Sequence, residues 1–373
     1  MPKPTKPRSG MHRREPGRLA AMLLALAIAS PCALAGEGGT SHIMPGGNAT
    51  MVDLPPTSPG GFFKPMVIDY RGEASATIPT AAGVVANLNA DASTLVLGGG
   101  YSLAQTVLGG AHFTVAAFLP YTRLSISGNS AALGGVQIQN SVSGLGDLTL
   151  VPLMLAWKSD NLQYDVLVPI YAPTGSYQTG RLGNTGLNYW TVDPIAGVAY
   201  SNAKTGLNAA AHLGLALNTE NSATRYKSGN VLHLDTSVQQ ILPLGSGFAN
   251  IGAEAWYFQQ VSCDSGAGAT LGCFKGRTAG IGPVLGYIQP MGQQALIFEF
   301  KWLPELDTRN RLKGDYLWLK MVYKFGCAGP RPLEGFRPPP GHAEATPART
   351  AGPLPAAGGT AVPGVGVAGR GQR

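Results

Sequence analysis

The feature that most constrains the fold is a regular series of strand-like stretches along most of the chain. Between Gly61 and Phe325, about twelve stretches rich in β-forming residues are bounded by Gly, Pro, Asn, Asp and Ser, and no long helical period interrupts them. The stretches cover residues 61–76, 93–103, 109–127, 141–157, 161–174, 186–201, 205–220, 230–242, 247–262, 277–289, 293–304 and 314–325.

The connections between these stretches alternate in length. Those after even-numbered stretches are short: "LAQTV", "KSDN", "SNAKT", "PLGS" and "QPMGQ". Those after odd-numbered stretches are long: "LSISGNSAALGGVQIQNS", "GSYQTGRLGNTG", "TENSATRYKSGN", "SCDSGAGATLGCFKG" and "PELDTRNRLKG". Short turns at one rim and long loops at the other are typical of an outer-membrane barrel, whereas a soluble sandwich has no reason to alternate in this way.

We therefore predict an all-β fold, a closed antiparallel transmembrane β-barrel of about 12 strands over residues 61–325, with both barrel ends of the chain in the periplasm.

Alternation within the strands indicates which face meets lipid. In "QALIFEFKW", Phe298, Phe300 and Trp302 share one face, and Glu299 and Lys301 share the other. We expect the aromatic face to contact lipid and the charged face to line the lumen.

The charge of the chain is concentrated at its ends. The formal net charge is +7, but residues 1–35 hold six Lys or Arg against one acid, and residues 326–373 hold five against two. The residues between them are close to neutral, so no basic folded face is expected, and we predict no nucleic-acid partner.

The two ends and the segment 36–60 have different predicted roles. Basic residues precede the apolar run "LAAMLLALAIAS", and "ALA" at 33–35 is a typical cleavage pattern, so residues 1–35 are predicted to be a signal peptide removed after Ala35. Residues 36–60 are turn-rich and lie either in the periplasm or in the lumen as a plug. The Pro-, Gly- and Ala-rich tail 326–373 has too little apolar area to fold and is predicted to be disordered.

The four cysteines favour an oxidising compartment. Cys32 leaves with the signal peptide, while Cys263 and Cys273 flank a Gly-rich loop and are predicted to form a disulfide. Cys327 remains as a single thiol. No CxxC spacing is present, and we predict neither a metal site nor a cofactor.

Several runs resemble a known family. They are "GTSHIMPGG" near the predicted mature start, "GLGDLTLVP", "VPIYAPTGSY", "GRLGNTGLNYWTVDP" and "LNTENSATRYKSGNVLHLD". In this order they are similar to outer-membrane proteins encoded with meta-cleavage phenol-degradation pathways, often described as transporters. The resemblance implies a Gram-negative outer-membrane barrel that passes small hydrophobic or aromatic molecules. The chain departs from that pattern in the long tail after Phe325.

Inward-facing positions of the barrel supply the candidate site. By parity, those predicted to line a permeant path are Asp165, Tyr171, Asp193, His233, Asp235, Glu254, Trp256, Glu299, Trp318 and Lys320. The alternative is that the charged members pair across strands, because lumen charges need partners. Strands eleven and twelve, paired about a loop near 309, put Glu299 opposite Lys320, which suits a salt bridge. The residues of 219–235 form either a ligand gate or a loop ordered by its own hydrogen bonds.

Three functions are compatible with this sequence, and passage of small hydrophobic or aromatic compounds is the one we favour. The alternatives are a general narrow porin for polar solutes and a structural barrel without transport. An apolar pocket with few polar groups favours the first, a continuous charged water path the second, and a packed lumen the third.

No histidine lies in a GxSxG elbow, so no enzyme activity and no catalytic residue is predicted. The expected partners are outer-membrane lipid, the outer-membrane assembly machinery and the permeant.

Overall fold

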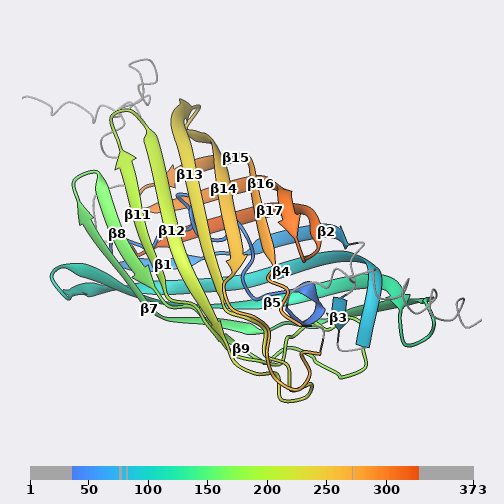
Figure 1. The fold of residues 1–373 in the computed structure, drawn as a ribbon. Coiled ribbons are helices and arrows are strands. Elements are labelled where there is room, and N and C mark those ends of the chain that lie inside the picture. The colour runs from blue at the N-terminus through green and yellow to red at the C-terminus, as the bar shows by residue number, and fades with distance from the viewer. Residues whose placement is uncertain (1–35, 75–77, 81–82, 271, 327–373) are drawn as a thin grey trace, which may run out of the picture. The chain divides into compact units, whose positions relative to one another are not determined.

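Nearly all regular structure in the described part of the chain is β-strand (Figure 1). The computed structural model describes residues 36–74, 78–80, 83–270 and 272–326. Within these ranges the exception is one short 3-10 helix, η1 (Glu37–Gly39). No helix of the described residues is long and apolar enough to cross a membrane.

The strands form a closed ring of twelve barrel strands, as predicted. The strand labels run to β17 because some barrel strands are interrupted and carry two or three labels. The interrupted ones are β1 (Gly60–Phe63), β2 (Met66–Ala74) and β3 (Ile78–Thr80), then β6 (Val136–Leu145) with β7 (Leu148–Ser159), β8 (Leu162–Leu167) with β9 (Ile170–Ala172), and β10 (Thr191–Val192) with β11 (Ile195–Asn202). The continuous ones are β4 (Gly83–Val107), β5 (Ala111–Ser130), β12 (Leu207–Asn218), β13 (Val231–Leu244), β14 (Gly247–Gln260), β15 (Arg277–Met291), β16 (Gln294–Arg309) and β17 (Lys313–Phe325).

The ring closes where β17 meets the first barrel strand. β17 pairs antiparallel with β16 on one side and with β2 and β1 on the other, with Trp318 opposite Ile68 and Lys324 opposite Phe62. All other neighbours in the ring are also antiparallel. Closure leaves no exposed sheet edge, which is what a strand-built membrane span requires.

The two faces of the sheet differ as the alternation predicts. On β16 the side chains of Phe298 and Trp302 are 41% and 45% exposed, whereas those of Ile297 and Lys301 are 4% and 0% exposed. A soluble monomer rarely exposes so many large apolar side chains together. The outward face therefore suits lipid, and the polar residues lie inside.

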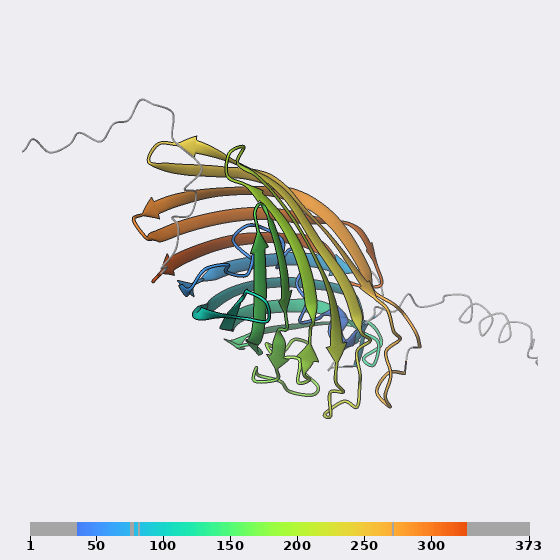
Figure 2. The same ribbon diagram turned by 90° about the vertical axis from the view of Figure 1, so that its left-hand side faces the viewer.

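The connections define two rims. Tight turns lie at 108–110, 160–161, 203–206, 245–246 and 292–293, and we name this end the short-turn rim. Four of them overlap the predicted short connections, whereas the first follows the predicted connection "LAQTV", which belongs to β4. The opposite end, the long-loop rim, holds the extended loops 173–190, 219–230 and 261–276. Figure 2 shows the strands running between the two ends.

Several predicted boundaries are wrong, mainly toward the long-loop rim. The second barrel strand covers Gly83–Val107 and not 93–103, and most of the predicted loops 124–141 and 304–314 belongs to β5, β6, β16 and β17. The ladder continues there with polar residues on the outward face, as where Ser125 and Ser141 pair and their hydroxyls lie 3.2 Å apart. The apolar residues Leu124, Ile126 and Ile138 face inward there, so the stretch lacks the lipid-facing apolar residues that mark a membrane strand.

Residues 36–59, which we name the lumen segment, run inside the barrel from one rim to the other (Figure 1). The segment begins at Gly36, hydrogen-bonded to loop 261–276, and ends at β1, which pairs with the end of β17. Between these points it contacts inward-facing side chains of β13, β16 and β17. Of the two predicted locations for this segment, the structure shows the lumen.

Cys263 and Cys273 form a disulfide within loop 261–276. The predicted signal peptide, the predicted tail from residue 327, and with them Cys32 and Cys327, lie outside the described residues.

Candidate functional site

The side chains predicted to line a permeant path all lie inside the barrel. Tyr171 is half-buried, and the other nine are buried. The structure does not leave them around an open path, because the lumen segment lies among them and contacts three of the charged ones, Asp235, Glu299 and Lys320.

The lysine cluster, which we define as Asp53 with Lys64, Lys301 and Lys320, is the main anchor of the lumen segment. One Asp53 oxygen lies 2.5 Å from the ammonium of Lys64, and the other lies 2.7 Å from that of Lys320 and 3.1 Å from that of Lys301. The Thr50 hydroxyl donates to the same carboxylate over 2.6 Å. Burial alone would raise the Asp53 pKa, but the three ammonium groups outweigh burial and hold this pKa well below its usual value.

Two wall carboxylates complete the charge balance of the lysine cluster. Lys301 Nζ lies 2.7 Å from Glu254 and 3.4 Å from Glu299, and Lys320 Nζ lies 3.8 Å from Glu299. Glu299 and Lys320 are opposite each other in the ladder, which confirms the predicted pairing. With Asp53 the three lysines face three carboxylates, so these buried charges are compensated only when the lumen segment is in place.

A second anchor holds the turn at Gly46. The backbone N–H of Gly46 donates to Asp235 over 2.9 Å, and Asn48 donates to the same carboxylate over 3.4 Å. His233 lies 3.0 Å from Asp193 and 3.9 Å from Asp235. This group therefore joins β13, the residues between β10 and β11, and the lumen segment.

A third anchor surrounds His42, closer to the long-loop rim. Its ring nitrogens lie 2.7 Å from the Thr191 hydroxyl and 2.9 Å from the Asp147 carboxylate. The His42 ring stacks on Tyr171 at 5.0 Å between centroids and meets Tyr189 edge-on at the same distance. Asp147 in turn accepts backbone N–H groups from loop 173–190.

The five runs that resemble a family meet around this part of the lumen segment. "GTSHIMPGG" supplies His42, "GLGDLTLVP" supplies Asp147, "VPIYAPTGSY" supplies Tyr171, and "GRLGNTGLNYWTVDP" supplies Thr191. The fifth run supplies the Asn221 amide, which donates to Glu37 over 2.8 Å. The sequence features behind the resemblance are therefore largely contacts between the barrel and its lumen segment.

An aromatic cluster lies next to the lysine cluster on the inner wall. It comprises Tyr70, Phe118, Trp256, Tyr316 and Trp318. Tyr70 and Tyr316 are 4.5 Å apart between ring centroids, and Lys320 Nζ lies 4.8 Å from the Trp318 ring centre. The indole N–H groups of Trp256 and Trp318 are buried and have no hydrogen-bond partner among the described residues. Buried indoles normally find a partner, so these are two uncommitted donors within a buried apolar cluster.

The sequence argument missed several residues of the site. Asp53, Glu37 and His42 lie outside any strand, where inward or outward parity cannot be assigned. Asp147 lies at the interruption between β6 and β7. His212 on β12 pairs with Asp165 at 2.9 Å in the buried wall. Among the described residues no group of three His, Cys, Asp or Glu side chains is suited to hold a metal ion.

Fold and lumen together define a β-barrel of the outer-membrane type with an internal N-terminal segment. The chain belongs to the family described as "Putative MetA-pathway of phenol degradation", which matches residues 74–321. The lumen segment precedes the matched range.

A solved structure has the same fold. An outer membrane channel from Pseudomonas putida F1 superposes with a TM-score of 0.57 at 18% identity, covering 76% of this chain and 100% of that one. The beta domain of the Bordetella autotransporter BrkA is more distant, with a TM-score of 0.38 at 13% identity over 71% of this chain and 99% of that one. A search of curated protein sequences gave no match.

Proposed function

We propose that this protein is an outer-membrane channel for small aromatic molecules, closed at rest by the lumen segment. In this proposal the chain reaches the outer membrane of a Gram-negative cell after removal of residues 1–35, through the outer-membrane assembly machinery, and its role is transport and not catalysis. The family description and the channel fold support it.

The observation that carries the proposal is the aromatic cluster with its two uncommitted indole donors. An apolar aromatic surface with a few polar groups is how proteins bind small organic molecules. A phenol placed against this surface would stack its ring on the aromatic side chains, and its hydroxyl oxygen would accept a hydrogen bond from Trp256 or Trp318. The adjacent lysine cluster is fully paired, so it offers no free charge to select inorganic ions.

The test is uptake of labelled phenol and labelled toluene by cells with and without the protein. Toluene has the ring of phenol but no hydroxyl. The variants Trp256→Phe and Trp318→Phe keep an aromatic ring and remove the indole donor, so we expect them to slow phenol uptake and leave toluene uptake unchanged. Trp302→Phe, on the outward face and 45% exposed, is the matched control and should change neither.

Conductance in planar bilayers separates the two competing functions. A large ohmic conductance that scales with salt, together with uptake that does not depend on the protein, would identify a general porin. No conductance and no protein-dependent uptake of either compound would identify a structural barrel.

A further inference from the structure

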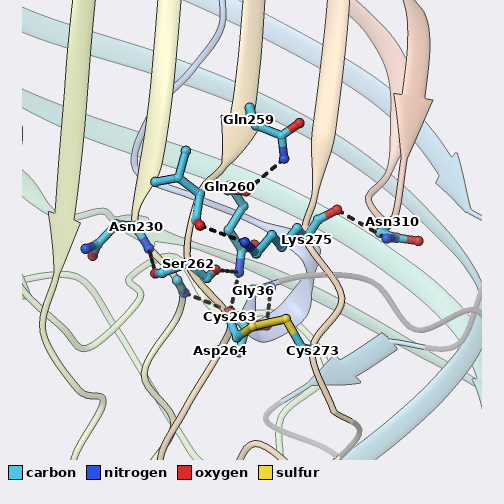
Figure 3. The surroundings of a disulfide bond; sticks show 12 residues. Gly36, Asn230, Gln259, Gln260, Ser262, Cys263, Asp264, Cys273, Lys275 and Asn310 are labelled. Atoms are coloured by element: carbon cyan, nitrogen blue, oxygen red, sulfur yellow. Dashed lines mark hydrogen bonds between the residues drawn. A yellow bond between two sulfur atoms is a disulfide. The ribbon is translucent and has the colours of Figure 1, made fainter.

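The first residue of the lumen segment is held by a carboxylate in the long-loop rim. Gly36 N lies 2.9 Å from Asp264 Oδ2, and Asp264 follows the disulfide cysteine Cys263 in the chain (Figure 3). Gly36 is buried, and Asp264 is half-buried. The start of the lumen segment is thereby joined to a loop that the disulfide closes.

Asp264 collects hydrogen-bond donors but no cation. Its oxygens accept from the Gly229 backbone N–H over 2.7 Å, the Tyr226 hydroxyl over 2.6 Å and the Gln260 amide over 2.8 Å. Among the described residues no Lys, Arg or His side chain forms an ion pair with it. A half-buried carboxylate is stabilised most by a charged hydrogen-bond donor. Apart from the three neutral donors named above, the nitrogen of Gly36 is the group that contacts Asp264.

The nitrogen that contacts Asp264 is also the one that signal-peptide removal would free. Hydrolysis of the Ala35–Gly36 bond adds water across the peptide, leaves a carboxylate on Ala35 and gives Gly36 an amine that takes up a proton. The α-amino group has an ordinary pKa of about 8 and is charged near neutral pH. The product is an ammonium group with three donors, at hydrogen-bond distance from the carboxylate.

We propose that Asp264 is the binding site for the α-ammonium of the mature chain, created when cleavage occurs between Ala35 and Gly36. The resulting ion pair fixes the outer end of the lumen segment to loop 261–276, while β1 fixes its other end to the barrel wall. The proposal does not depend on what the barrel transports.

The first measurement is the N-terminal sequence of the full-length protein after expression and extraction from outer membranes. We expect the chain to begin Gly-Glu-Gly-Gly-Thr. A different first residue would overturn the proposal at once.

The second measurement is the rate of reductive methylation of the α-amine in the folded protein at neutral pH, followed by peptide mass spectrometry. Loss of a charge-assisted hydrogen bond should raise the fraction of chains whose α-amine is free to react by at least about tenfold. Asp264→Asn should therefore accelerate labelling by that factor or more. Asp160→Asn, in a turn at the opposite rim, is the control and should match the wild type. Equal labelling of wild type and Asp264→Asn would exclude the ion pair.

A third variant tests the charge without touching Asp264, which also orders its own loop. Two residues inserted between Ala35 and Gly36 turn the Gly36 nitrogen into a neutral amide and move the ammonium away. Cleavage of the folded protein after Glu37 by a glutamate-specific protease should then be faster than in the wild type, by the same factor as in Asp264→Asn. Cleavage at the wild-type rate would show that the amide suffices and would refute the role of the ammonium. Heat-modifiable gel migration checks that each variant folds.

Discussion

At the scale of single residues, the charge balance of the lumen depends on Asp53. Its carboxylate contacts three ammonium groups that are otherwise left with two wall carboxylates. All of these side chains are nearly fully buried, where an unpaired charge is costly and screening by solvent is weak.

Replacing Asp53 by Asn should therefore destabilise the barrel and loosen the lumen segment. Removing one partner from a buried ion pair costs roughly 3–5 kcal/mol in free energy of unfolding. The measurement is the urea concentration at which half of the protein has lost heat-modifiable gel migration, which we call the urea midpoint. Asp91→Asn is the matched control, because Asp91 forms an exposed pair with Arg71 at 3.8 Å and should change the midpoint little. Equal midpoints for the two variants would contradict this account.

The same carboxylate predicts a dependence on acid. Because the Asp53 pKa is held below its usual value in the folded protein, its contribution to stability is complete above the usual pKa of about 4 and is lost as the pH falls through the folded pKa. We expect pepsin to cleave the lumen segment increasingly as the pH is lowered from about 4 toward 2. In Asp53→Asn this transition should be absent, with the segment accessible throughout that range.

The residue-level site was only partly predictable from the sequence. Strand parity located wall residues such as Asp235 and Glu254, and hairpin geometry predicted the pairing of Glu299 with Lys320. Asp53 was not predictable, since a carboxylate in a turn-rich segment has no periodic pattern to orient it, and the lysines it contacts are more than 240 residues away along the chain, except Lys64.

At the scale of elements, the lumen segment fits the barrel through one tight turn. Gly46 has a φ of +78°, and a Cβ added there would lie 2.3 Å from Leu303 Cδ1 on the wall. Only glycine combines this backbone conformation with such a close approach.

Gly46→Ala should lower the free energy of unfolding by roughly 2–5 kcal/mol, because it adds backbone strain and a clash with Leu303. Gly109→Ala separates the two effects, because Gly109 has the same φ of +78° with no atom within 4 Å of an added Cβ, and it should cost only about 1–2 kcal/mol. The measurement is hydrogen exchange of the amides in 43–53 together with the urea midpoint. Identical losses in both variants would show that the contact with Leu303 is unimportant.

The elements themselves were predictable wherever one face meets lipid. The turns at 160–161 and 245–246 and the alternation of β16 follow directly from the sequence. The extensions of β5 and β6 were not, because their outward face is polar, as where Ser125 and Ser141 pair, and carries no apolar residues for lipid. The location of the lumen segment was also left open, since its composition suits a periplasmic peptide as well as a plug.

At the scale of the whole molecule, the proposed function makes the lumen segment the element that closes the barrel. If transport requires it to move, fixing it to the wall should stop uptake. The Ser237 hydroxyl donates to the Ala49 carbonyl over 2.8 Å, so Ala49→Cys with Ser237→Cys, in a Cys327→Ser background, places two thiols within reach of a short bis-thiol cross-linker. We expect cross-linked cells to lose phenol uptake and each single-cysteine variant to retain it. Undiminished uptake after complete cross-linking would show that permeants pass beside a fixed segment.

The position of Asp53 also has a consequence for the order of assembly. Its carboxylate contacts Lys64, between β1 and β2, and Lys320, on β17, so it bridges the two strands that are farthest apart in the chain and adjacent at the closing seam. Asp53 is exported early, whereas its partner on β17 arrives among the last residues of the barrel. While the seam is open, Lys320 on β17 lacks Asp53 as a counter-charge, and Asp53 lacks one of its three ammonium partners. We therefore expect pairing of the first strand with the last and docking of the segment to be coupled, because a barrel closed around an empty interior would leave three lysines facing two wall carboxylates.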